Sequence, residues 1–156
     1  MFHRTLKLLS IQGSGATVLD SILLPDMQVS SLATSPDRIF IATSPYYSYY
    51  GSNSDAPDPA KLITLDGLHD GHLRIASTLA LQQDMSWPRL IADATRALIV
   101  GSYPPVLHVY DTSNAAAPTE TKKADLYSWA YDIRVVGDNA MCTLGEYGVQ
   151  TVPLSN

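Results

Sequence analysis

The sequence has a single cysteine in 156 residues, so no disulfide bond can form within the chain. This residue, Cys142, lies in the apolar run NAMCTLG, and no basic neighbour is present there to lower the pKa of its thiol. We therefore expect an unreactive residue of a buried strand.

Positive charge is also scarce, since ten lysines and arginines stand against fifteen acidic residues and give a net charge of −5. The absence of a basic cluster excludes a nucleic-acid groove and a surface for anionic membranes.

Long hydrophobic runs are missing as well. No apolar run approaches the roughly 18 residues that a membrane-spanning helix needs. The first twenty residues carry basic residues and then an apolar patch, but Lys7, Ser10 and Gln12 interrupt this patch too early for the core of a signal peptide. With 46% hydrophobic and 16% charged residues, the composition is that of one globular domain with an ample core.

Motifs of the common enzyme classes are absent or incomplete. The stretch GSGAT (13–17) has no lysine after its last glycine and no helix pattern behind it, so we predict a hairpin turn and not a phosphate loop. No Gly-x-Ser-x-Gly elbow occurs. Asp93 and Asp132 stand near strand ends without a partner base. His108 falls inside an apolar strand, where we expect a hydrogen-bonded or edge-facing histidine and not a catalytic base. The sequence thus favours a protein that is not an enzyme.

Metal-binding patterns are equally weak, and we expect neither a metal nor another cofactor. Asn53, Asp55 and Asp58 offer oxygen ligands at short spacing, but the glycine and the closing glutamate of an EF-hand are missing. His69 and His72 flank an Asp-Gly pair without a visible third ligand, which favours a solvated hairpin turn over a zinc site.

The sequence does contain an internal repeat. The run RALIVGS (96–102) matches NAMCTLG (139–145) at a spacing of 43 residues, and VYDTSN (109–114) matches TVPLSN (151–156) at 42. The related run RIFIATS (38–44) lies 58 residues before RALIVGS. An insertion of 13 residues within the stretch 44–59 reduces this spacing to 45 and restores the period.

Each repeat contains four short runs of β-branched and apolar residues, bounded by glycine, proline, aspartate and asparagine, as is typical of strands. Units of four strands with a period of about 40–45 residues are typical of β-propeller blades. We therefore predict an all-β fold, an incomplete β-propeller of about three four-stranded antiparallel blades. The blades span approximately residues 13–67, 71–112 and 117–155, and residues 5–12 form the closing strand of a preceding blade.

Four elements follow one another within residues 109–152: an apolar strand with an Asp-x-Ser turn (109–118), the entry WAYDI (129–133), the strand and turn VVGDNA (135–140) and the closing strand GVQTV (148–152). In these elements the chain resembles the LVIVD-type repeat of β-propeller proteins. The likeness is good over the last 50 residues or so and loose over the rest. It implies a propeller fold and an extracellular or periplasmic setting, because such families are mostly secreted bacterial proteins whose molecular roles are not defined.

Three blades are fewer than the roughly 4–8 of a closed propeller. An open arc would expose apolar blade faces and unpaired strand edges, which promote aggregation. We expect the remaining blades to come from a second copy, giving six blades from two chains, from another polypeptide, or from a longer form of this chain.

The stretch SPYYSYYGSNSDAPDP (44–59) is the inserted loop of the first repeat. Its tyrosines offer large contact areas with polar tips, as binding sites do, although they would equally fold back onto their own blade. The candidate binding residues are Tyr46, Tyr47, Tyr49, Tyr50, Asn53 and Asp55.

These observations lead to three functional hypotheses. The first is a scaffold or protein-interaction module within a larger or oligomeric assembly. The second is a lectin-like propeller that binds carbohydrate through the tyrosine-rich loop, and the third is a hydrolase or lyase completed by the missing blades.

Trp87 and Trp129 occupy equivalent places in successive repeats, and we expect them to pack between blades.

Overall fold

Strands that alternate in direction build the described structure. The computed structural model describes residues 4–24, 28–44, 59–81, 85 and 87–155. The prediction of an all-β fold is confirmed, since these residues form strands and one three-residue 3-10 turn, Gly145–Tyr147. None of their helical structure has the length and apolarity needed to cross a membrane. The strands are β1 (Arg4–Gln12), β2 (Gly15–Leu24), β3 (Gln28–Thr34), β4 (Ile39–Ser44), β5 (Lys61–Asp66), β6 (Arg74–Ala80), β7 (Arg89–Ala92), β8 (Arg96–Ser102), β9 (Pro105–Asp111), β10 (Thr119–Asp125), β11 (Asp132–Val136), β12 (Asn139–Thr143) and β13 (Val149–Pro153).

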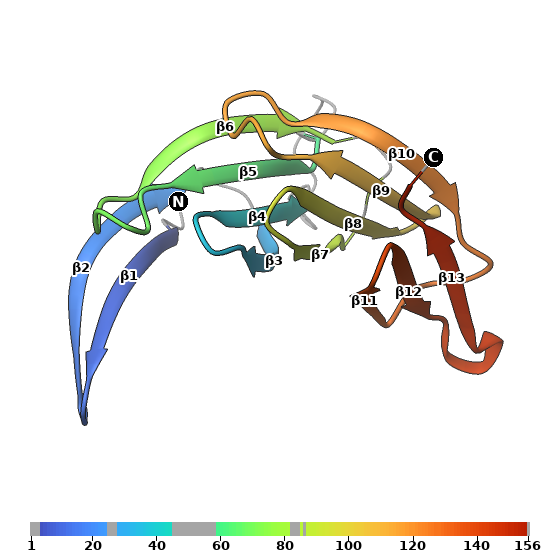
Figure 1. The fold of residues 1–156 in the computed structure, drawn as a ribbon, viewed down its shortest axis with the longest axis horizontal. Helices are drawn as coiled ribbons and strands as arrows, with labels where there is room; N and C mark the ends of the chain where they lie inside the picture. Colours follow the sequence, from blue (N-terminus) through green and yellow to red (C-terminus); the bar gives the residue numbers. More distant parts are fainter. Residues whose placement is uncertain (1–3, 25–27, 45–58, 82–84, 86, 156) are drawn as a thin grey trace, which may run out of the picture.

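The strands form four antiparallel sheets, each a simple succession of neighbours in the chain. The hairpin β1–β2 comes first, followed by the sheets β3–β6, β7–β10 and β11–β13. Figure 1 shows these sheets following one another along an arch, with β2, β6 and β10 on the convex side and β3, β7 and β11 on the concave side. The two-residue turn between β1 and β2, with Gly13 at φ +60°, confirms the hairpin predicted for GSGAT.

The sheets begin one strand later than the repeats into which the sequence was divided. The second predicted blade begins at residue 71 and so includes β6, yet β6 pairs with β5 and completes the preceding sheet. In the same way, β1 from the predicted closing strand 5–12 pairs with β2. A repeat period gives the spacing of equivalent strands and leaves open where a sheet starts. The turn 67–73 decides this, because it returns the chain directly alongside β5.

Three apolar cores lie between successive sheets. Side chains along a strand point alternately to its two faces, so β4 places Ile41 in the core shared with the hairpin and Phe40 in the core shared with β7–β10. On β8, Ile99 faces β3–β6 and Leu98 faces β11–β13. Each of these four side chains is fully buried, which contributes about 1.5–3 kcal/mol apiece to folding.

We call the core between β7–β10 and β11–β13 the third core. It contains Cys142, as the sequence predicts for a buried strand residue. Burial raises the pKa of its thiol, which keeps the sulfur in the weakly nucleophilic protonated form.

Candidate functional site

The connections that follow even-numbered strands lie at one edge of the sheets, because an antiparallel chain reverses direction at every turn. Among the described residues, every exposed tyrosine and tryptophan side chain lies in one of these connections. We call this the aromatic edge, and its residues are Trp87, Tyr103, Tyr127, Trp129, Tyr131 and Tyr147.

One surface hollow opens within the aromatic edge, between the connection from β10 to β11 and the connection from β12 to β13. It has a volume of about 410 Å³. We call it the aromatic hollow, and it is lined by Ser128, Trp129, Tyr131, Leu144, Glu146 and Tyr147. Leu144 is buried and belongs to the third core, so the hollow lies directly on packed structure.

Backbone hydrogen bonds fix the two connections that border the hollow, one between them and one within the connection from β12 to β13. The Tyr131 N–H donates to the Thr143 carbonyl at 2.8 Å, and the Leu144 N–H donates to the Gly148 carbonyl at 2.8 Å. Gly145 lies in the left-handed region at φ +64°, and a Cβ at this position would stand 2.8 Å from Cε2 of Tyr131. Glycine is therefore required here both by the turn and by the close approach of the tyrosine ring.

A glutamine fixes the connection from β10 to β11. The Gln150 Oε1 atom accepts a hydrogen bond from the Tyr127 N–H at 3.0 Å, and its Nε2 donates to the Asp125 carbonyl at 3.1 Å. The Leu126 N–H also donates to the Pro105 carbonyl at 2.8 Å. The segment that bears Trp129 and Tyr131 is thus tied to two neighbouring strands.

The aromatic hollow offers ring faces and hydrogen-bonding groups side by side. Trp129, Tyr131 and Tyr147 are 58–64% exposed, although large aromatic side chains usually bury most of their surface. Glu146 adds a carboxylate, and the lining contains no lysine or arginine to neutralise it. The exposed lining of the hollow is more polar than apolar, so a ligand that fits it offers hydrogen-bonding groups as well as apolar surface.

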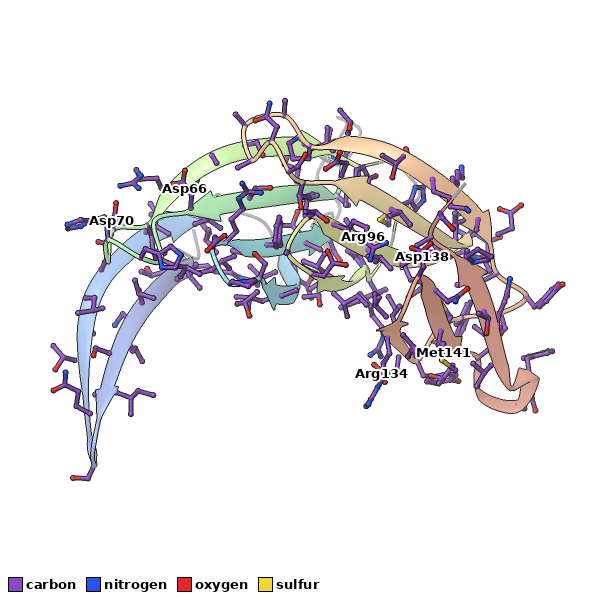
Figure 2. All side chains as sticks on the ribbon, viewed as in Figure 1. Asp66, Asp70, Arg96, Arg134, Asp138 and Met141 are labelled. Carbon is purple, nitrogen blue, oxygen red and sulfur yellow. The ribbon has the colours of Figure 1, made fainter. Side chains whose placement is uncertain are left out.

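The opposite edge of the sheets contains a second hollow, of about 290 Å³, and its character is different. Its lining includes Asp37, Asp66, His69, Asp70 and Arg74, and Figure 2 shows Asp66 and Asp70 at the end of the arch that adjoins the hairpin. Arg74 pairs with Asp66 at 3.2 Å and with Asp70 at 2.8 Å, while His69 Nε2 lies 2.6 Å from Asp37. These charges are paired within the hollow, and the Arg74 side chain holds the pKa of Asp70 below its usual range.

His69 and His72 lie in the turn between β5 and β6, as predicted for a hairpin turn. The His72 N–H donates to the Gly67 carbonyl at 3.1 Å, and both histidines are exposed. Among the described residues, no three histidine, cysteine, aspartate or glutamate side chains are grouped to hold a metal ion.

Asp93, Asp132 and His108 each have a hydrogen-bonding or ion-pair partner in the structure. Burial of the Asp93 carboxylate works to raise its pKa, but the Thr95 and Arg96 N–H groups and the Arg96 side chain outweigh this, so its pKa is lowered. Asp132 pairs with Arg134 at 3.1 Å on the surface. His108 is buried with Nδ1 2.7 Å from Glu120 Oε1, which confirms the prediction of a hydrogen-bonded histidine.

The packing role expected of the two tryptophans is wrong. Trp87 and Trp129 are 60% and 58% exposed, so neither fills a core between sheets. Both lie in the connections that precede β7 and β11, and the adjoining strands supply the buried side chains Leu90 and Ile133 instead. The size of a tryptophan favours burial, but its place in the chain decides which surface it reaches.

The tyrosine-rich insertion falls mostly outside the described residues. Its flanking strands end and begin at Ser44 and Lys61, at the aromatic edge. The candidate binding residues Tyr46, Tyr47, Tyr49, Tyr50, Asn53 and Asp55 all lie in the range 45–58, outside the described residues.

The comparisons with known proteins do not add a family to these observations. No protein-family model matches the chain, and no curated protein matches its sequence. The LVIVD resemblance therefore stays a prediction.

The sequence does contain a signal for the aromatic hollow that pattern analysis missed. Residues 127–131, YSWAY, place three aromatic residues at alternate positions, and GEYG (145–148) adds a fourth beside a carboxylate. The two segments are separated by two strands, so their meeting depends on the pairing of β11 with β12.

Proposed function

We propose that this chain is a non-enzymatic segment of a β-propeller, of the LVIVD type and extracellular, that acts as a scaffold and protein-interaction module. Support for the architecture comes from antiparallel sheets that follow one another along an arch and pack face to face through apolar cores. A single sheet of this kind cannot bury both of its faces, so each sheet depends on the sheets packed on either side of it.

The observation that carries this proposal is an uncovered apolar face on the first hairpin. One face of β1–β2 packs against β4 and β5. The opposite face carries Lys7 and exposes four large apolar side chains around it. We call this the hairpin face, and its residues are Leu9, Ile11, Val18 and Leu23. Leu9 and Val18 are direct cross-strand neighbours, and Ile11 is 75% exposed. A two-stranded hairpin with such a face is marginal in water and calls for a partner.

The partner that fits the hairpin face is the last sheet of a second copy. At the far end of the arch, β11–β13 exposes Val136, Met141 and Val149 on the side that faces away from the third core. Figure 2 shows Met141 on this sheet beside Arg134. We call Val136, Met141 and Val149 the terminal face. Since every sheet stacks in the same direction along the arch, head-to-tail contact between hairpin face and terminal face continues the same packing.

Charge substitutions at both faces test this proposal. Ile11→Lys in the hairpin face and Val149→Lys in the terminal face each place an unpaired charge in the proposed contact. Ala116→Lys, in the exposed turn between β9 and β10, adds the same charge outside both faces and is the matched control. Sedimentation velocity over a concentration series compares the three variants with the wild-type chain.

We expect the wild type and Ala116→Lys to associate, and both face variants to sediment as monomers of 16.9 kDa. Circular dichroism establishes that the variants are folded. In a mixture of the two, Val149→Lys keeps an intact hairpin face and Ile11→Lys keeps an intact terminal face. The mixture should therefore form pairs of one Ile11→Lys chain and one Val149→Lys chain, and nothing larger. Association that survives both substitutions would overturn the proposed contact.

A further inference from the structure

We propose that the aromatic hollow binds the ring of a neutral saccharide. The inference rests on the hollow itself and is independent of the assembly proposed above. Its lining is Ser128, Trp129, Tyr131, Leu144, Glu146 and Tyr147.

The aromatic rings of the hollow suit the faces of a sugar ring. A pyranose presents C–H groups on its two faces and hydroxyl groups around its rim, so it stacks on an aromatic ring while its rim stays available for hydrogen bonds. Trp129, Tyr131 and Tyr147 keep more than half of their surface exposed, and they gather in one hollow from two connections. Covering these rings removes apolar surface from water.

The polar groups of the hollow suit the rim of the same ring. The Glu146 carboxylate accepts hydrogen bonds, and the hydroxyl groups of Ser128, Tyr131 and Tyr147 both donate and accept. Gln150 and the bond from Tyr131 to Thr143 hold the surrounding backbone in place. A site fixed before the ligand arrives loses less conformational entropy on binding.

The shape of the hollow decides against the main rival ligand, an alkylated ammonium ion. Aromatic rings with a carboxylate also attract such cations, but the attraction is strongest where the cation is desolvated by rings on several sides. Here the three rings are 58–64% exposed and the hollow measures about 410 Å³. An open site of this kind suits a sugar ring, whereas an alkylated ammonium ion binds best in a small closed cage of rings.

The two tryptophans of the chain make the test direct. Trp87→Phe leaves Trp129 as the sole tryptophan, and Trp129→Phe leaves Trp87, which is equally exposed but lies outside the hollow. Each variant is titrated with lactose, maltose, cellobiose and N,N′-diacetylchitobiose while tryptophan emission is recorded. We expect a saturable change with at least one disaccharide in Trp87→Phe and none in Trp129→Phe.

Calorimetry with the disaccharide that binds best then measures the contribution of each group. Trp129→Ala is expected to weaken binding about tenfold. Tyr103→Ala removes an exposed ring of the aromatic edge outside the hollow and should leave the affinity unchanged. Glu146→Gln keeps a hydrogen-bond acceptor but removes the charge, so saccharide binding should fall by no more than about threefold.

Three outcomes would overturn the inference. The first is the absence of a saturable response to all four disaccharides in Trp87→Phe. The second is an equal response in Trp129→Phe, which would place binding elsewhere. The third is binding of tetramethylammonium, lost in Glu146→Gln, without binding of any disaccharide, which would assign the hollow to cations.

Discussion

Leu98 and Met141 occupy matching positions in successive sheets, and the structure predicts very different consequences for their truncation. In β7–β10, Leu98 pairs across strands with Ile91 and Val109, and all three face the core shared with β11–β13. In β11–β13, Met141 pairs in the same register with Arg134 and Thr151. Leu98 is fully buried, whereas Met141 is 36% exposed because no further sheet covers it in the described structure.

Leu98→Ala removes a side chain that contacts two sheets and leaves a cavity between them. Such a change costs about 2–5 kcal/mol, a large part of the roughly 5–15 kcal/mol by which a domain is stable. A loss of about 3 kcal/mol lowers the melting temperature of a chain of this size by about 6–12 °C. Met141→Ala leaves no closed cavity, and we expect a loss of no more than about 1 kcal/mol at concentrations where the chain is monomeric.

Thermal unfolding followed by far-ultraviolet circular dichroism measures both changes. At high concentration the cost of Met141→Ala should rise, because association stabilises the folded chain and the terminal face takes part in it. Equal destabilisation by the two substitutions in the monomer would refute the stacking described for these sheets. A cost below about 1 kcal/mol for Leu98→Ala would refute it as well.

Three further predictions concern single contacts. Asp20 accepts hydrogen bonds from the Ser21 and Leu73 N–H groups at 2.7 Å each, and these bonds lower its pKa. Its contribution to the free energy of unfolding is therefore present above the unfolded pKa of about 3.8 and is lost as the pH falls through the lower folded value. The urea midpoints of wild type and Asp20→Ala should differ at pH 7 and converge as the pH falls through that value. Gly145→Ala should lower the melting temperature and weaken disaccharide binding, whereas the control Gly137→Ala, at φ +60° with open space around its Cβ, should lower only the melting temperature. Glu120→Ala leaves the buried His108 Nδ1 atom without this partner and should cost about 1–3 kcal/mol in urea unfolding, and no measurable loss would contradict a role for this bond.

The local elements could be predicted because they depend on neighbouring residues. Runs such as IFIAT and ALIVG alternate between two apolar faces, and the intervening turns use glycine, aspartate and proline. The segment RIASTLA likewise forms a strand, β6. The grouping of strands into sheets depends on non-local pairing, and there the division of the sequence differed from the structure by one strand.

The candidate site was harder to predict because it depends on residues that are distant in sequence. Tyr131 and Tyr147 line one hollow only because β11 and β12 pair and bring their two connections together. The exposed tryptophans show the same limit, since their equivalent places in successive repeats suggested packing between blades. The density of tyrosine directed attention to residues 44–59, and of these the structure describes only Ser44 and Pro59.

The central claim is that the chain is an interaction module that assembles through its hairpin face and terminal face. The most direct test is the absolute mass of the wild-type chain by light scattering after size exclusion, over a concentration series. Head-to-tail closure predicts a stable species of twice 16.9 kDa whose mass stops rising with concentration. A monomer of 16.9 kDa at every concentration would contradict the claim.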